Sequence, residues 1–275
     1  MYVVSCRKGF TPPQLLAAEN RYRNYKNPAD PDVFDELNLT DILSVATNKH
    51  VCILVHGFNT GIGQAMSAYW EIVDRMNKTG VVGPQGYGLV IGFLWPGFST
   101  PAGYAPAVLN ANRSGPRLLD LVNHLRGVAH SVDVQTHSLG ARVALMAMKS
   151  PKRVFVDNLI LSAPAVDNHI LEPAEAFFPA MDSCNRCMVY HSDKDAVLSS
   201  AFALVDFTDG FHGALGRKGP RSKPVTLSKT PNVYVVDCTA RVQTDHSGYR
   251  KTNKYFEHWK TVLSGGPLSR YDELS

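Results

Sequence analysis

The sequence lacks the features that assign several classes of protein directly. Its five cysteines are an odd number spread along 275 residues, so no disulfide framework is predicted. No apolar run approaches the roughly 20 residues of a membrane-spanning helix. The formal net charge is only +4, and the one basic cluster, at residues 217–223, is typical of a solvated loop. We therefore expect no membrane span and no nucleic-acid partner.

Metal and targeting signals are also scarce. Cys184 and Cys187 have the spacing of a metal or redox pair, but no second pair and no histidine cluster completes a four-ligand zinc site. Cys52 and Cys238 lie in apolar runs and are predicted to be buried thiols. Residues 1–8 lack the charged-then-apolar order of a signal peptide, which favours a cytoplasmic protein. The sequence thus predicts no metal site, and it gives no sign of an oligomeric state.

The composition is that of an ordinary globular chain. With 44% hydrophobic and 19% charged residues, it is long enough for one large α/β domain over residues 1–275. Expected strands lie at residues 51–59 and 88–95, around Val132 and Val134, and at residues 154–162, 187–191 and 232–238. Expected helices lie at residues 63–78, about 114–127, 139–148, 196–205 and 253–263. This alternation predicts a parallel sheet with helices on both faces.

Other segments give weaker signals. Residues 1–6 alternate enough to form an edge strand, and residues 11–48 carry weak helical signals and are expected to cover one edge of the sheet. Residues 96–112 are rich in glycine, proline and small residues and are predicted to form a long surface loop. Residues 164–186 are a candidate for a short lid, and residues 206–231 form another long connection at the expected rim of the site.

Residues 132–149 carry the strongest chemical signal. A short strand and a helix that is apolar nearly all round flank the sequence Thr136-His137-Ser138-Leu139-Gly140, a small-x-Ser-x-Gly pattern typical of a tight strand-to-helix turn. A serine hydroxyl is a weak nucleophile, so it needs a neighbouring base and nearby N–H groups. Gly140 supplies the small residue that such a turn requires. Thr136 stands where glycine is commoner, which is acceptable if its hydroxyl finds a partner.

Several further motifs follow one another in a recognisable order. They are His56-Gly57-Phe58-Asn59, residues 93–97, 136–140, 161–167, 192–198 and 245–249. In this order the chain resembles the serine α/β-hydrolases, and most of all a bacterial group of α/β-hydrolases of unknown function. The resemblance covers residue 51 to the end. It implies an α/β-hydrolase fold, with a mostly parallel central sheet of about 7–8 strands and helices on both faces.

The resemblance also implies roles for individual residues. Ser138 corresponds to the nucleophile, His246 to the general base and Asp195 to the acid that orients the base. The alternatives that remain open are His212 for the base and Asp193 or Asp167 for the acid. The non-catalytic interpretation is that Ser138 merely caps a helix after a buried strand.

An oxyanion hole is expected from two backbone N–H groups, those of Leu139 and Phe58. Gly57 lets the backbone approach the substrate, and the Asn59 side chain is expected to hold the loop in shape. The predicted substrate-binding residues are His56, Gly57, Asn59, His137, Tyr104 and Phe177.

These assignments predict two-step acyl transfer without a metal or an organic cofactor. The expected substrate is a small-molecule carboxylic ester. Apolar residues within the segment 164–186 suggest a small to medium acyl group, although the same residues fit the packed core of a short helix equally well. Two alternatives remain: an acyltransferase or thioesterase that uses the same triad, and a non-catalytic binding module of the same fold.

Overall fold

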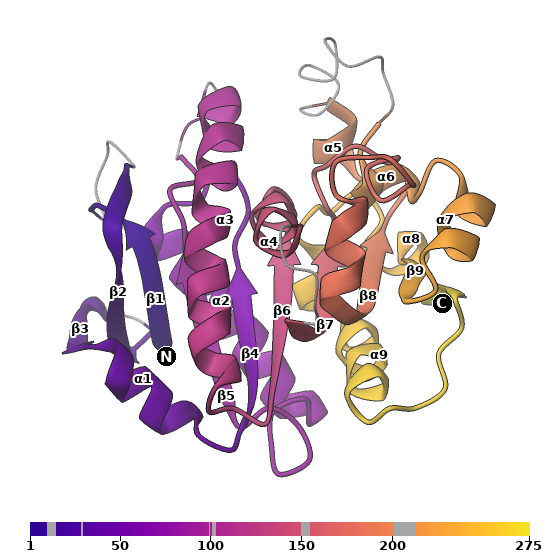
Figure 1. Cartoon of the computed structure of the whole chain (residues 1–275). Helices are drawn as coiled ribbons and strands as arrows, with labels where there is room; N and C mark the ends of the chain where they lie inside the picture. The colour runs from indigo at the N-terminus through magenta and orange to yellow at the C-terminus, as the bar shows by residue number, and fades with distance from the viewer. Residues whose placement is uncertain (10–14, 29, 99, 101–102, 150–154, 201–212) are drawn as a thin grey trace.

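A mostly parallel sheet of ten strands forms the centre of the molecule (Figure 1). This computed structural model describes residues 1–9, 15–28, 30–98, 100, 103–149, 155–200 and 213–275. The strands are β1 (Tyr2–Arg7), β2 (Leu16–Asn27), β3 (Asp30–Leu37), β4 (His50–Val55), β5 (Leu89–Leu94), β6 (Ser131–His137), β7 (Val156–Ser162), β8 (Cys184–His191), β9 (Val233–Asp237) and β10 (Tyr271–Glu273). Their order in the sheet is β10-β9-β8-β7-β6-β4-β5-β1-β2-β3.

Helices cover both faces of this sheet. They are α1 (Leu39–Ala46), α2 (Ile62–Thr79), α3 (Tyr104–Arg126), α4 (Gly140–Met148), α5 (Ala196–Ser200), α6 (Leu215–Lys218), α7 (Lys223–Lys229), α8 (Thr239–Val242) and α9 (Asn253–Leu263), with 3₁₀ turns η2 (Phe178–Ser183) and η4 (Gly248–Lys251). Helices α3 and α4 pack against each other in front of the sheet in Figure 1, and α2 and α9 pack together behind it. None of the helices in the described ranges has both the length and the apolarity to cross a membrane.

The predicted α/β-hydrolase class is confirmed, but the sheet is wider than the expected 7–8 strands. Every pair from β10 to β1 is parallel, whereas β2 pairs antiparallel with both β1 and β3. Residues 16–27 and 30–37 are therefore strands, not a covering segment with helical character. Their many polar side chains do not give the apolar pattern by which a strand is predicted. Ion pairs between β2 and β3, such as Arg23–Glu36 (2.7 Å) and Lys26–Asp35 (2.6 Å), support this hairpin.

The prediction that residues 1–6 form an edge strand was wrong. Strand β1 lies between β5 and β2, and Val3, Val4, Ser5 and Cys6 are all at most 2% exposed. A strand that is paired on both sides and covered on both faces belongs to the interior of a sheet. The first strand of the chain is thus an inner strand, the third from one edge of the sheet.

The predicted surface loop at residues 96–112 was also wrong over its second half, because α3 begins at Tyr104. Pro106 lies in the first turn of the helix, where the missing N–H is not needed. The helix continues through Pro116 and packs closely on α4: a Cβ at Gly115 would lie 2.6 Å from the Met146 Cβ. Tertiary packing therefore overrides the breaking effect of the proline.

Two further predictions concern residues 164–186 and 196–205. In the candidate lid at residues 164–186, the side chains of Ile170, Leu171, Phe177 and Met181 are at most 6% exposed and belong to the core. The alternative of packed core thus describes these residues. The helix expected at residues 196–205 is described as α5, Ala196–Ser200, and residues 201–212, which include His212, lie outside the described residues.

Candidate active site

Ser138 occupies a tight turn between β6 and α4. Its φ of 54° lies in the left-handed region, which is uncommon for a residue with a side chain and is typical of functional turns. The Ser138 N–H donates to the Ser162 carbonyl at 3.0 Å, and its own carbonyl accepts from the N–H groups of Ala165 and Ala141, each at 3.1 Å. These three bonds hold the strained backbone from both neighbouring segments.

Small residues let the turn approach the end of β4. A Cβ at Gly140 would lie 2.5 Å from the His56 carbonyl oxygen, and a Cβ at Gly57 would lie 2.9 Å from the Ser138 Cβ. The contact that requires Gly140 is thus with the adjacent strand β4. Thr136 is fully buried, and its hydroxyl donates to the Ile160 carbonyl at 3.3 Å, so the threonine has the partner that its position demands.

Asp195 and His246 form a close pair at the ends of two different elements. Asp195 follows β8 and immediately precedes α5, and its Oδ2 lies 2.7 Å from Nδ1 of His246. The second oxygen, Oδ1, accepts from the Leu198 N–H at 2.9 Å. The Asp195 side chain is 1% exposed, against 12% for His246. A carboxylate in this place fixes the proton on Nδ1 and leaves Nε2 of the imidazole able to accept one.

The other candidate acids lie in different environments. Asp193 is exposed, its N–H donates to the Thr239 hydroxyl at 3.0 Å, and its carbonyl accepts from Arg217 at 3.2 Å. Asp167 forms an isolated bridge with Ala214. The structure therefore brings Asp195 to His246, and it gives neither alternative this position.

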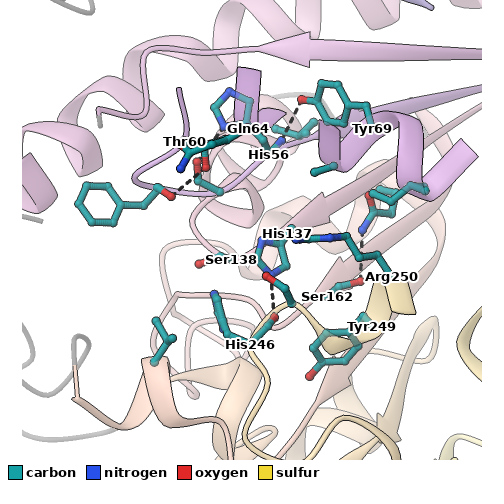
Figure 2. A pocket seen from close by; sticks show the side chains of 18 of the residues that line it. His56, Thr60, Gln64, Tyr69, His137, Ser138, Ser162, His246, Tyr249 and Arg250 are labelled. Atoms are coloured by element: carbon teal, nitrogen blue, oxygen red, sulfur yellow. Dashed lines mark hydrogen bonds between the residues drawn. The ribbon is translucent and has the colours of Figure 1, made fainter. Parts of the chain in front are cut away.

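Ser138 and His246 line one cavity of about 500 Å³ (Figure 2), within the size range of small-molecule sites. Across the described ranges, no side-chain hydrogen bond joins the two residues. Catalytic hydrogen bonds are commonly long in unliganded sites and shorten when the substrate binds. Ser138 and His246 thus face the same cavity.

Two backbone N–H groups at this cavity are available as donors. Within the described ranges, neither the Phe58 N–H nor the Leu139 N–H donates to another protein group. Phe58 lies in the loop of residues 56–60 that follows β4, and this 56–60 loop lines the cavity. Asn59 has a φ of 53°, a left-handed conformation that asparagine tolerates. Its N–H donates to the Gly97 carbonyl at 3.1 Å.

His56 and His137 line the cavity as neutral rings. His56 Nδ1 donates to the Gly57 carbonyl at 2.8 Å, and burial, followed by the charge of Arg7, holds the pKa of His56 well below its usual value. Desolvation, followed by the nearby His246, lowers the pKa of His137 to about 3. Both rings therefore act as hydrogen-bonding groups at neutral pH.

Tyr104 and Phe177 do not line the cavity, which corrects their assignment as substrate-binding residues. The Tyr104 ring packs edge-on against Phe58, with 5.1 Å between centroids. Phe177 is 2% exposed, and the Arg142 guanidinium lies 5.5 Å from its centroid. Tyr104 thus supports the 56–60 loop from outside, and Phe177 belongs to the core.

Sequence reasoning missed much of the cavity wall. Its inner part is polar: Gln135 Nε2 donates to Ser162 Oγ at 3.3 Å, and Ser162 Oγ lies 2.8 Å from the Tyr255 hydroxyl. Arg250, at the rim, donates to Glu71 at 2.6 Å. Gln135 and Ser162 lie near the carboxyl ends of the adjacent strands β6 and β7, where α/β sheets place ligands. That position is the signal that could have identified them.

Metal-binding groups are not assembled at this site. No group of three or more histidine, cysteine or acidic residues that could hold a metal occurs among the residues that the structure describes. Cys184 and Cys187 are buried free thiols, as are Cys52 and Cys238. The cysteine pair therefore lies in the core, away from solvent.

The fold and the turn at Ser138 define an α/β-hydrolase. The sequence model of a family described as "Alpha/beta hydrolase of unknown function (DUF900)" matches residues 34–241, and the chain belongs to this family. The chain is also similar to a crystal structure of the products of the gene lin2722 from Listeria innocua, with 11% identity, a TM-score of 0.46, and coverage of 83% of this chain and 99% of that chain. No curated protein matches the chain.

Proposed function

We propose that this protein is a serine hydrolase that cleaves carboxylic esters through an acyl-enzyme. The observation that carries the proposal is the 2.7 Å hydrogen bond between Asp195 and His246 on the same cavity as Ser138, whose φ of 54° raises its side chain on a strand-to-helix turn. A buried carboxylate bonded to an imidazole that shares a cavity with a strained serine supports the roles of acid, base and nucleophile.

The first half-reaction acylates the enzyme. His246 Nε2 removes the proton from Ser138 Oγ, which attacks the ester carbonyl carbon. The negative charge that develops on the carbonyl oxygen is stabilised by the N–H groups of Phe58 and Leu139. Asp195 stabilises the imidazolium. The intermediate then collapses: the bond between the carbonyl carbon and the alkoxy oxygen breaks, and the alcohol leaves with the proton from His246.

The second half-reaction restores the enzyme. A water molecule attacks the acyl carbon while His246 accepts one of its protons. The second tetrahedral intermediate forms at the same N–H groups. It collapses by releasing Ser138 Oγ, which regains its proton from His246, and the carboxylic acid departs.

The cavity supports a small to medium acyl group. Its volume is about 500 Å³, and Ala68, Ile72 and Trp259 contribute apolar wall. These residues belong to α2 and α9, which lie behind the sheet in Figure 1. The acyl chain would therefore extend from Ser138 toward the side chains of these two helices. Burial of each methylene contributes about 0.8 kcal/mol, which favours a chain that fills this space over acetate.

Hydrolysis of p-nitrophenyl esters, from acetate to palmitate, tests the proposal. We expect the wild type to hydrolyse the short and medium members, and Ser138→Ala to lower kcat by about 10⁶-fold. Ser199→Ala, which changes an exposed serine of α5, is the matched control and should retain full activity. Activity retained in Ser138→Ala would contradict the proposal, and a wild type inactive on every ester would favour a binding module.

A further inference from the structure

Arg7, the last residue of β1, is a buried cation. It is 1% exposed and is one of the largest fully buried side chains of the described part of the chain. Arginine is almost never buried to this extent without a carboxylate partner. Yet in the described ranges no ion pair involves Arg7, and all the groups that accept its hydrogen bonds are formally neutral.

The guanidinium binds the segments that follow β4 and β5. Nε donates to the Trp95 carbonyl at 2.8 Å, and Nη2 donates to the Thr60 carbonyl at 2.9 Å. Nη2 also lies 3.0 Å from His56 Nε2. Because His56 Nδ1 donates to the Gly57 carbonyl, Nε2 is the acceptor of that contact. Arg7 thus holds both ends of the 56–60 loop, His56 and Thr60, which Figure 2 shows at the cavity.

This loop carries the Phe58 N–H, one of the two proposed oxyanion donors. Other bonds also fix the loop. The Thr60 hydroxyl donates to the Phe58 carbonyl at 3.0 Å within it, and Trp95 Nε1 donates to the His56 carbonyl at 2.7 Å from outside. A donor of this kind must be held within about 0.5 Å of its productive position. The guanidinium adds a tie from both ends of this loop to strand β1.

The electrostatics of Arg7 point to the same site. Its Nη1 is buried without a hydrogen-bond partner among the described residues, and burial lowers the pKa of the guanidinium to about 10. A buried charge without a counter-charge destabilises the fold. The anchoring of β1 does not need it, because β1 pairs with strands on both sides. The uncompensated charge instead lies against the two ends of the 56–60 loop, His56 and Thr60.

We propose that Arg7 is a positioning residue for catalysis: it fixes the 56–60 loop, so that the Phe58 N–H faces the oxyanion. This inference rests on the proposed ester hydrolysis at Ser138. It makes the N-terminal strand, which precedes the family match at residues 34–241, a working part of the site.

The test compares Arg7→Met and Arg7→Lys with a control, Arg117→Met. Arg117 binds β2, through the carbonyls of Ala17, at 3.3 Å, and Ala18, and these bonds do not involve the 56–60 loop. For each variant, kcat and KM are measured with the best ester of the series. The inhibition constant of a trifluoromethyl ketone, whose adduct with serine carries an oxyanion, is measured in parallel.

We expect Arg7→Met to lower kcat and the affinity for the trifluoromethyl ketone by a similar factor, about 30- to 100-fold, with KM changed by less than about threefold. Arg7→Lys should lose less, because the ammonium keeps the charge but cannot reach all the acceptors. Arg117→Met should keep wild-type values of all three constants, although its melting temperature falls.

Each outcome decides the question. If the folded Arg7→Met protein keeps wild-type kcat and inhibitor affinity while Ser138→Ala is inactive, Arg7 is only a structural anchor and this inference alone is overturned. If the wild type hydrolyses no ester, the proposed function and this inference both fall. Should Arg7→Met not fold, as judged by circular dichroism, Arg7→Gln is held to the same criterion.

Discussion

His137 donates from Nε2 to the backbone carbonyl of His246 at 2.8 Å (Figure 2), so the residue before the proposed nucleophile holds the loop that carries the proposed base. The two rings lie 4.6 Å apart between centroids. Because His137 is neutral at the pH of most assays, the bond depends on its N–H and not on a charge. The turn at Ser138 and the loop at His246 are therefore positioned as one unit.

Replacing His137 should separate these two parts of the site. We expect His137→Leu to lower kcat/KM on the order of 10- to 100-fold, because a displacement of the base by about 1 Å costs this much. His137→Gln, whose amide N–H₂ can reach the same carbonyl, should recover most of the loss. Steady-state kinetics with one ester measures both. Equal activity of His137→Leu and the wild type would show that the His246 loop is held by other contacts.

The identity of the acid can be settled by two matched substitutions. Asp195→Asn removes the negative charge that fixes the His246 tautomer and should lower kcat by roughly 10⁴-fold. Asp193 is exposed, and its hydrogen bonds to Thr239 and Arg217 are made by its backbone N–H and carbonyl. Because Asp193→Asn leaves these backbone groups in place, it should change activity by less than about twofold. If Asp193→Asn loses more activity than Asp195→Asn, the acid is Asp193, and the 2.7 Å contact between Asp195 and His246 does not serve catalysis.

Gly57 is expected to be intolerant of even one added methyl group. Its Cβ would lie 2.9 Å from the Ser138 Cβ and 3.2 Å from the His137 carbonyl oxygen, so Gly57→Ala must push the 56–60 loop away from the turn. We expect a loss in kcat of about 100-fold and a destabilisation of about 1–3 kcal/mol. Gly63→Ala, at a position of α2 with nothing within 4 Å of the added Cβ, should leave kcat unchanged. Assays and thermal melts of the two variants make the comparison.

How much could be predicted from the sequence depends on how local each signal is. Strands β4 and β5 were predictable because burial on both faces gives continuous apolar runs. The turn at Ser138 was predictable because its geometry constrains five adjacent residues. Strands β2 and β3 were not predictable, because their polar side chains give no apolar pattern. These residues are strands because β2 pairs with β1 and with β3, and the partners are not visible in the local sequence. Arg7 gave no signal, because its acceptors His56 and Trp95 lie 49 and 88 residues further along the chain.

A similar buried polar network lies on β6, outside the cavity. Asp133 is 1% exposed. Its Oδ2 accepts from the Tyr87 hydroxyl at 2.6 Å and from Asn158 Nδ2 at 2.8 Å, and its Oδ1 accepts from the Asn158 N–H at 2.9 Å. No ion pair in the described part of the chain involves this carboxyl. Burial therefore raises the pKa of Asp133 from 3.8 to about 6 despite these bonds.

This shift predicts a pH-dependent stability. The folded-state pKa of Asp133 lies above the unfolded value. The stability that comes from the protonated carboxyl is therefore fully present below about pH 4 and is lost as the pH rises through about 6. In urea titrations, Asp133→Asn should therefore raise the free energy of unfolding at pH 8 by about 1–3 kcal/mol and show little gain at pH 4. Asn158 Oδ1 lacks a partner among the described residues, so a flipped Asn158 amide can accept a hydrogen bond from the introduced amide group. An equal effect at both pH values would contradict the assigned charge cost.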